Sequence, residues 1–262
     1  MSTYISLVLS GGGMRGCAHI GVLKRLEELS IKPRFISGTS IGAIIGVLIA
    51  DGYSADEIQA IFLKSKFGFD FNYLRFTEAL LSSKRIEDIL KKHLRSKTFE
   101  DLKTPLHVCV TDYHTGKAEY LHTGKLLPAV LASSAIPLLY KPVKIEGKLF
   151  VDGGVSRNLP TAPLKDKNLP IVGVHVNPLL KSSKKSMTQK IDHNMHLLLL
   201  EKTLEASRDC SIYIEPEKLS THSMFETKTI TQLVEIGYSK AKSVLEPELV
   251  LGLSGGNLES GL

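Results

Sequence analysis

The feature that most constrains this chain is the pentapeptide Gly38-Thr39-Ser40-Ile41-Gly42, which has the pattern G-x-S-x-G. A short run at 34–37 precedes it, and an apolar run at 43–50 follows it. This order predicts a strand, a tight turn and a helix, with the serine hydroxyl projecting from the turn as a nucleophile. The flanking glycines let backbone and substrate approach closely. The pattern alone is weak evidence, because glycine and serine also gather in ordinary turns.

A second glycine-rich turn, Gly-Gly-Gly-Met-Arg-Gly at 11–16, lies between a predicted strand at 5–9 and a predicted helix at 17–29. Two interpretations compete for it. It fits the dinucleotide fingerprint G-x-G-x-x-G, but that site needs an acidic residue at the end of the second strand, where Thr39 and Ser40 stand. We favour the other interpretation, an oxyanion hole, in which backbone N–H groups bind the charge that develops on an attacked carbonyl.

A serine hydroxyl needs a base to become a good nucleophile. Among nine histidines, His222 in a predicted loop is the best candidate for a Ser-His-Asp triad. Asp152 is the alternative partner, since it ends a predicted strand at 148–151 and precedes Gly153 and Gly154. Two glycines leave no bulk that would keep the aspartate away from another loop. Asp-Gly-Gly is also a common turn, so both partners remain open on the residues alone.

The rest of the chain predicts strands alternating with helices. Further strands are expected at 106–111, 118–121, 143–145, 171–176 and 211–215, and further helices at 54–64, 84–94, 126–135, 187–208 and 226–245. We expect an α/β fold with three α/β/α layers and a mainly parallel central sheet. Alternating aromatics at 66–75 suggest an apolar lid, a strand or a loop. One catalytic domain is expected over 1–250, and a disordered Gly/Ser-rich tail over 251–262.

Composition limits the partners and the cellular compartment that we expect for this protein. The net charge of +6 suits anionic membranes, nucleic acid or acidic substrates, but no zinc spacing or RNA-binding motif supports nucleic acid. Three widely spaced cysteines read as free thiols in a reducing compartment. We see no signal peptide and no uncharged stretch of about 18 residues. We therefore expect a cytoplasmic protein, with peripheral contact to an anionic membrane open and no indication of its oligomeric state.

Four blocks together carry a resemblance to a known family. They are Gly11–Gly16, Gly38–Gly42, Ala132-Ser133-Ser134-Ala135-Ile136-Pro137, and Asp152-Gly153-Gly154 with Asn158 and Pro160. In this order, from about residue 5 to about residue 176, they resemble the patatin-like phospholipases, which implies a patatin-like fold. Plant members have aspartate at the position of Ser10, just outside the glycine core.

The resemblance implies a Ser-Asp dyad without histidine, in which Ser40 is the nucleophile and Asp152 its proton acceptor. It assigns the oxyanion hole to Gly11, Gly12, Gly13 and Arg15, and it implies no metal or organic cofactor. The expected substrate is a phospholipid or another acyl-ester lipid. The expected activity is lipid acyl ester hydrolysis of the phospholipase A or lysophospholipase type through an acyl-serine intermediate.

Three alternatives to lipid acyl ester hydrolysis remain open. The same acyl-serine could pass its acyl group to an alcohol or thiol, as in an acyltransferase, or serve a general carboxylesterase. Acyl-carrier transacylases share the serine turn but rely on histidine and arginine, so a pairing of Ser40 with Asp152 argues against them. A catalytically silent lipid-binding protein is the third alternative, and the intact serine, aspartate and glycine turn argue against it.

Overall fold

A mixed sheet of eight strands forms the centre of the computed structural model, which describes residues 3–65, 84–137, 139–179, 187–222 and 230–245. The strands are β1 (Thr3–Leu9), β2 (Ile31–Thr39), β3 (Leu106–Asp112), β4 (Ala118–Leu121), β5 (Val143–Ile145), β6 (Lys148–Asp152), β7 (Ile171–Val174) and β8 (Ile212–Ile214). Hydrogen-bonded pairs connect them along the path β5-β6-β3-β2-β1-β7-β8, and β4 is also paired to β3. Strands β1, β2, β3, β7 and β8 are parallel, and β4, β5 and β6 add antiparallel pairs.

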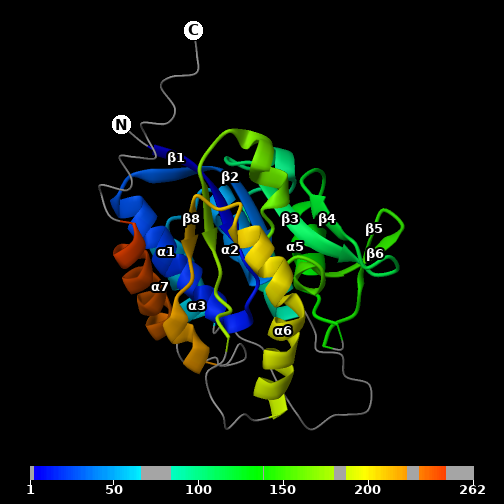
Figure 1. Ribbon diagram of the computed structural model, residues 1–262. Coiled ribbons are helices and arrows are strands. Elements are labelled where there is room, and N and C mark those ends of the chain that lie inside the picture. The colour runs from blue at the N-terminus through cyan, green and yellow to red at the C-terminus, as the bar shows by residue number, and fades with distance from the viewer. Residues whose placement is uncertain (1–2, 66–83, 138, 180–186, 223–229, 246–262) are drawn as a thin grey trace.

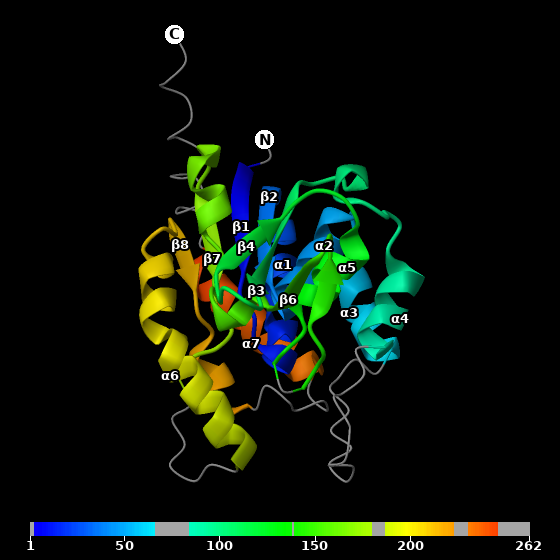
Figure 2. The same cartoon turned by 90° about the vertical axis from the view of Figure 1, so that its right-hand side faces the viewer.

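Helices cover both faces of this sheet. They are α1 (Cys17–Glu28), α2 (Ile41–Ala50), α3 (Ala55–Lys64), α4 (Lys84–His93), α5 (Leu126–Ser133), α6 (Met187–Ser207) and α7 (Ile230–Val244). Figure 2 shows α6 on one side of the sheet and α2, α3, α4 and α5 on the other. Alternation along β1 matches these layers, because Leu7 and Leu9 join the larger core while Val8 joins a smaller cluster with Ala206 of α6. The predicted three-layer fold with a mainly parallel sheet is confirmed.

Most predicted elements are present with small shifts at their ends. The capping box predicted at Ser54 opens α3, since the Ser54 hydroxyl accepts from the Glu57 N–H and the Glu57 carboxylate accepts from the Ser54 N–H. Strand β7 ends earlier than predicted, because the Val176 N–H bonds to the Ser10 hydroxyl instead of a neighbouring strand. The aromatic stretch at 66–75 and the tail at 251–262 lie outside the described residues. Within the described part of the chain, no helix has the length and apolar character needed to cross a membrane.

Helices α1 and α7 pack side by side, as Figure 1 shows in blue and red-brown. Their contact depends on two reciprocal glycines. A Cβ atom at Gly21 of α1 would lie 1.9 Å from the Val234 carbonyl, and one at Gly237 of α7 would lie 2.0 Å from the Ala18 carbonyl. The two backbones therefore touch directly, and α7 packs against the helix that begins with the glycine-rich turn.

Candidate active site

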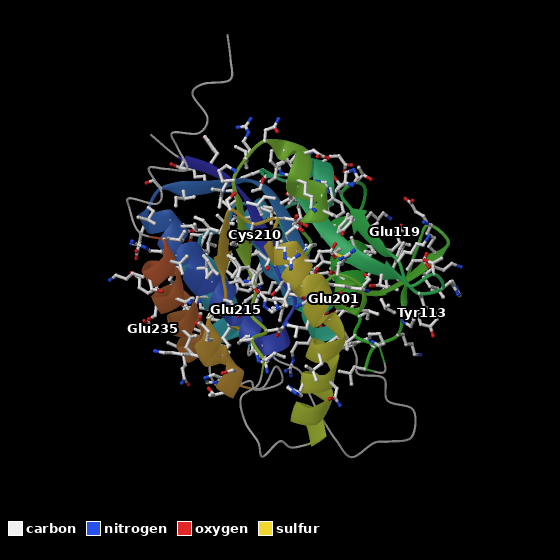
Figure 3. All side chains as sticks on the ribbon, in the orientation of Figure 1. Tyr113, Glu119, Glu201, Cys210, Glu215 and Glu235 are labelled. Carbon is white, nitrogen blue, oxygen red and sulfur yellow. The ribbon has the colours of Figure 1, made fainter. Side chains whose placement is uncertain are left out.

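Several buried polar side chains lie near the ends of central strands. Charged residues such as Glu201 and Glu235 lie on the outside, where Figure 3 shows them on α6 and α7. In contrast Arg15 is 0% exposed, Asp152 5% and Ser40 7%. Charged groups are seldom buried unless they have partners or a function. Ser40 directly follows β2, Asp152 is the last residue of β6, and Arg15 lies in the turn after β1, so these strand ends hold the candidate site.

Ser40 occupies a strained turn between β2 and α2. Its φ is 55° and its ψ is −122°, a conformation that costs a residue other than glycine on the order of 1–3 kcal/mol. The two glycines of the motif allow this turn. A Cβ atom at Gly42 would lie 2.3 Å from the Leu9 carbonyl oxygen, and one at Gly38 would lie 2.5 Å from the Gly42 carbonyl oxygen. The strand, tight turn and helix predicted from the pentapeptide are therefore present, with Ser40 directly before α2.

Strand β3 brings the serine and the aspartate together. Thr39, the last residue of β2, pairs with Cys109, and Asp152, the last residue of β6, pairs with Val110. Strand β4 also pairs with Cys109 and Val110, so it occupies one edge of β3. Strands β2 and β6 therefore lie end to end along the other edge of β3. Because β6 is antiparallel to β3, its last residue meets the last residue of β2. The topology thus places Ser40 next to Asp152.

The Asp152 carboxyl is buried and held in place. Burial raises its pKa to about 6, and hydrogen bonds from the Ser40 hydroxyl and the Gly154 N–H act in the opposite direction. The Gly154 N–H donates to Oδ1 at 2.7 Å. The backbone is fixed as well, since the Thr111 hydroxyl donates to the Asp152 carbonyl at 2.9 Å. The result is a carboxylate that touches the serine and is more basic than an ordinary aspartate, yet mostly ionised at pH 7.

The glycine-rich turn lies against Ser40. A Cβ atom at Gly11 would lie 3.3 Å from the Ser40 Cβ and 2.7 Å from the Asn158 Oδ1, so a side chain there would displace the Asn158 amide. The Gly11 N–H already donates to the Asn158 carbonyl at 3.3 Å. Gly12 and Gly13 follow at the start of a short 3-10 helix, Gly13–Gly16, where N–H groups have no acceptor within the helix. Among the described residues, no acceptor meets the Gly12 or Gly13 N–H, so these two predicted donors can bind an oxyanion.

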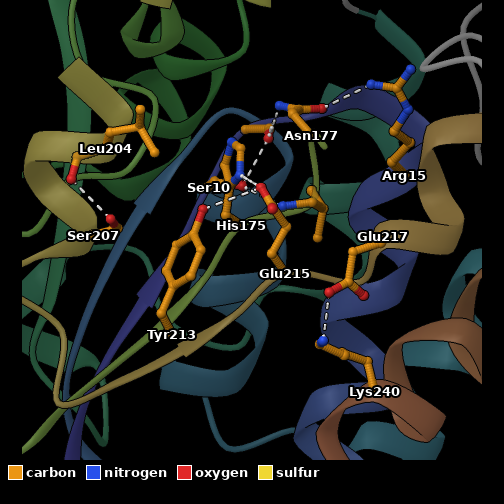
Figure 4. Close-up of polar contacts among 12 residues, drawn as sticks. Ser10, Arg15, His175, Asn177, Leu204, Ser207, Tyr213, Glu215, Glu217 and Lys240 are labelled. Carbon is orange, nitrogen blue, oxygen red and sulfur yellow. Dashed lines mark hydrogen bonds and ion pairs between the residues drawn. The ribbon is translucent and has the colours of Figure 1, made fainter. Parts of the chain in front are cut away.

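The Arg15 side chain bonds to the protein interior. Figure 4 shows its guanidinium reaching Asn177, with Nη1 donating to Oδ1 at 3.2 Å, and Nε donates to the His222 carbonyl at 2.9 Å. Asn177 in turn donates from Nδ2 to the Gly11 carbonyl at 2.6 Å. The buried amide of Asn177 therefore ties the glycine turn to Arg15. Sequence reasoning missed Asn177, because its role arises only where β7 pairs with β1.

The described histidines take other positions. His222 lies after a 3-10 helix at 217–221, and its carbonyl accepts from Arg15. His175 contacts Glu215, Nδ1 to Oε1 at 2.8 Å, and the Tyr213 hydroxyl donates to the same oxygen at 3.3 Å (Figure 4). His19 Nε2 lies 2.9 Å from the Ser10 carbonyl, and burial lowers its pKa to about 4. Of the two predicted partners of Ser40, the structure brings Asp152 to the serine hydroxyl.

Curated proteins with similar sequences place the chain among its relatives. An uncharacterized NTE family protein of Mycobacterium tuberculosis is 33% identical over 183 residues, which cover 67% of this chain and 50% of that protein. A lysophospholipase of Emericella nidulans is 31% identical over 176 residues, 64% of this chain and 11% of that protein. The chain thus spans half or less of these relatives.

The fold also has a solved counterpart. The crystal structure of VipD from Legionella pneumophila superposes with a TM-score of 0.56 at 15% identity, covering 96% of this chain and 67% of that one, which shows likeness of fold alone. The family model of the patatin-like phospholipases matches residues 7–165, a span that includes the glycine turn, Ser40 and Asp152. This match covers more than half of the 262 residues, and the chain belongs to the patatin-like phospholipase family.

Proposed function

We propose that the chain is a lipid acyl hydrolase in which Ser40 and Asp152 form the catalytic dyad. The observation that carries the proposal is the contact of the Ser40 hydroxyl with a buried carboxylate at the strained turn before α2. A nucleophile within reach of a base, both fixed by backbone contacts, is the arrangement that serine hydrolysis requires. The pKa of about 6 at Asp152 also suits a base working near neutral pH.

Acylation follows from these positions. Asp152 accepts the proton of the Ser40 hydroxyl while the serine oxygen attacks the ester carbonyl carbon. The N–H groups of Gly12 and Gly13 stabilise the negative charge on the tetrahedral intermediate, and removing one such donor typically costs about 3–4 kcal/mol. The α2 N-terminus, which begins next to Ser40, adds partial positive charge. Asp152 then returns the proton to the leaving alcohol, and the acyl group stays on Ser40.

Deacylation repeats the same chemistry with water. Asp152 accepts a proton from a water molecule, whose oxygen attacks the acyl-serine carbonyl. The intermediate collapses to a carboxylic acid, and the proton returns to Ser40. In this proposal Gly11 and Arg15 shape the turn, because the Gly11 N–H donates to Asn158 and the Arg15 side chain bonds to Asn177.

The proposed substrate is a phospholipid or lysophospholipid. The name of the Emericella nidulans relative and the description of the family support this class.

We further propose contact with anionic membrane surfaces. The net charge is +6, and α4 exposes Lys84, Arg85 and Lys92. A basic residue near an anionic surface contributes about 1 kcal/mol. We expect the protein to cosediment with phosphatidylserine vesicles. Cosedimentation should be lost in high salt or when the vesicles contain only phosphatidylcholine.

Covalent labelling tests the dyad directly. A fluorophosphonate should attach to Ser40 of the folded protein, and peptide mass spectrometry should locate it there. Ser40→Ala and Asp152→Ala should each abolish hydrolysis of a short-chain chromogenic ester while circular dichroism stays unchanged. His222→Ala serves as the control and should retain activity.

Two results would count against the proposal. Folded wild type that does not react with the fluorophosphonate would point to a lipid-binding protein without hydrolysis. Full activity in Asp152→Ala together with loss in His222→Ala would replace the dyad by a triad. If the labelling result supports the dyad, mass spectrometry of lipids consumed from mixed vesicles would identify the acyl position and the headgroup.

A further inference from the structure

The side chain of Ser133 lies between the nucleophile turn and the central sheet. Ser133 is the last residue of α5 and is 0% exposed. Its Oγ accepts the Ser40 N–H at 2.9 Å and donates to the Cys109 carbonyl at 2.6 Å. A carbonyl oxygen can only accept, so the hydroxyl proton is committed to Cys109 and a lone pair receives the Ser40 N–H. One hydroxyl therefore connects the Ser40 backbone to β3.

This connection acts on the strained residue itself. The positive φ of Ser40 turns the peptide before it away from an ordinary strand geometry, and its N–H needs an acceptor in a buried environment. The direction of that N–H is coupled to the direction of the Cα–Cβ bond, which carries the nucleophilic oxygen. By accepting the N–H, Ser133 fixes where the Ser40 side chain points. Without the acceptor, the turn can relax and move the oxygen.

The same short segment holds the aspartate. The Asp152 N–H donates to the carbonyl of Ala135 at 3.0 Å, two residues after Ser133. Gly153 lies against the same Cys109 carbonyl that accepts from Ser133, since a Cβ atom there would be 2.3 Å from that oxygen. Residues 133–135 and Cys109 thus contact both halves of the site from one side.

We propose that Ser133 is a positioning residue that sets the approach of the Ser40 hydroxyl to Asp152. The inference rests on the dyad proposed above and adds the group that holds its geometry. Ser133 touches neither substrate nor the reacting atoms, so its effect reaches the chemistry through the Ser40 backbone. A displacement of the nucleophile by a fraction of an ångström lowers the rate of the chemical step and leaves substrate binding almost unchanged.

The adjacent serine provides a matched control. Ser134 is also buried, but its Oγ donates to the Val130 carbonyl at 3.0 Å, within the same turn of α5. Ser134→Ala removes the same atoms, one position along the chain, without removing an acceptor from the nucleophile turn. A difference between the two alanine variants therefore reports the contact with Ser40 and not a general effect on α5.

The experiment compares Ser133→Ala and Ser134→Ala in the full chain. Steady-state kinetics with a soluble ester give kcat and KM, fluorophosphonate labelling gives the reactivity of Ser40, and thermal unfolding checks the fold. We expect Ser133→Ala to lower kcat and the labelling rate by about 10- to 100-fold, with KM within about twofold of wild type. Ser134→Ala should stay within about twofold of wild type in both rates. If Ser133→Ala does not fold, Ser133→Cys keeps an atom at the Oγ position that is larger and a much weaker acceptor, and it should show the same loss.

Equal labelling rates for Ser133→Ala and Ser134→Ala would overturn the inference, whether both are fast or both are slow. A loss confined to KM would overturn it too, because it would place Ser133 in substrate binding. These outcomes differ from failure of the dyad. Wild type that cannot be labelled refutes the proposed function and this inference with it, whereas labelled wild type with an unimpaired Ser133→Ala variant refutes only the inference.

Discussion

Replacing Asp152 by asparagine is expected to abolish hydrolysis and also to make the folded protein more stable at pH 8. Burial raises the pKa of this carboxyl to about 6. The pKa of this carboxyl in an unfolded chain is about 3.9, so the folded and unfolded states differ by about two pKa units. At roughly 1.4 kcal/mol per pKa unit, this difference corresponds to about 3 kcal/mol. Asparagine has nearly the same shape and no charge. Its Oδ1 can still accept the Gly154 N–H that Asp152 accepts at 2.7 Å.

The pH dependence gives the prediction its sign. Below about pH 4 the carboxyl is protonated in both the folded and the unfolded state, so Asp152 adds no charge-related cost. Between about pH 4 and pH 6 the unfolded state loses its proton first, and the stability of the wild type falls as the pH rises. Above about pH 6 both states are ionised and the full cost of about 3 kcal/mol is present. The advantage of Asp152→Asn should therefore be small at pH 4 and largest at pH 8.

Thermal unfolding followed by circular dichroism at pH 4.5 and pH 8 measures this difference. For a chain of this size, about 3 kcal/mol raises the melting temperature by roughly 6–12 °C. Asp112→Asn is the matched control, because hydrogen bonds led by the Thr115 N–H lower the pKa of Asp112, so its loss should destabilise at pH 8. A less stable Asp152→Asn variant at pH 8, or an equal advantage at both pH values, would refute the reasoning.

Three further predictions test other parts of the structure. The ester hydrolysis rate kcat/KM should fall about tenfold per pH unit below about pH 6, as Asp152 becomes protonated, and a flat profile from pH 5 to pH 7 would contradict that assignment. Gly237→Ala should lower the free energy of unfolding in urea by about 3 kcal/mol, because its Cβ would overlap the α1 backbone. Gly46→Ala, whose Cβ would meet only side-chain atoms at 3.3 Å and beyond, should change it by no more than about 1 kcal/mol, and equal effects would disprove the argument. Asn177→Ala should lower the labelling rate of the nucleophile about tenfold, since an imprecisely held oxyanion turn loses transition-state stabilisation, and an unchanged rate would exclude that role.

The sequence predicted the fold well where one local pattern decides the structure. The strained turn at Ser40 needs glycines on both sides, and the capping box at Ser54 is complete within four residues. Both structures can therefore be predicted from a few neighbouring residues. The end of β6 at Asp152 was also predicted, because a short hairpin and two glycines surround it. What stays a prediction is chemical: the roles of Ser40, Asp152 and the glycine turn await the labelling experiment.

The contacts that hold the site could not be read from the sequence. Ser133 and Ser134 are neighbours of the same type, and only the rotation of α5 against β3 decides which one accepts from Ser40. Asn177 follows a strand without any motif, and it reaches the glycine turn because β7 pairs with β1. The meeting of Ser40 and Asp152 itself depends on two strands sharing one edge of β3. Each of these is a long-range pairing, which residue patterns do not encode.

The direct backbone contact between α1 and α7 bears on where this chain can be cut. The family match ends at residue 165, whereas α7, β7 and Asn177 come later. A fragment ending at 165 would leave the β1 edge unpaired and uncover the glycine face of α1, and open strand edges promote aggregation. We propose that residues 1–250 form one folding unit, so that such a fragment is insoluble alone and becomes soluble and reactive toward a fluorophosphonate when the remaining segment is co-expressed with it.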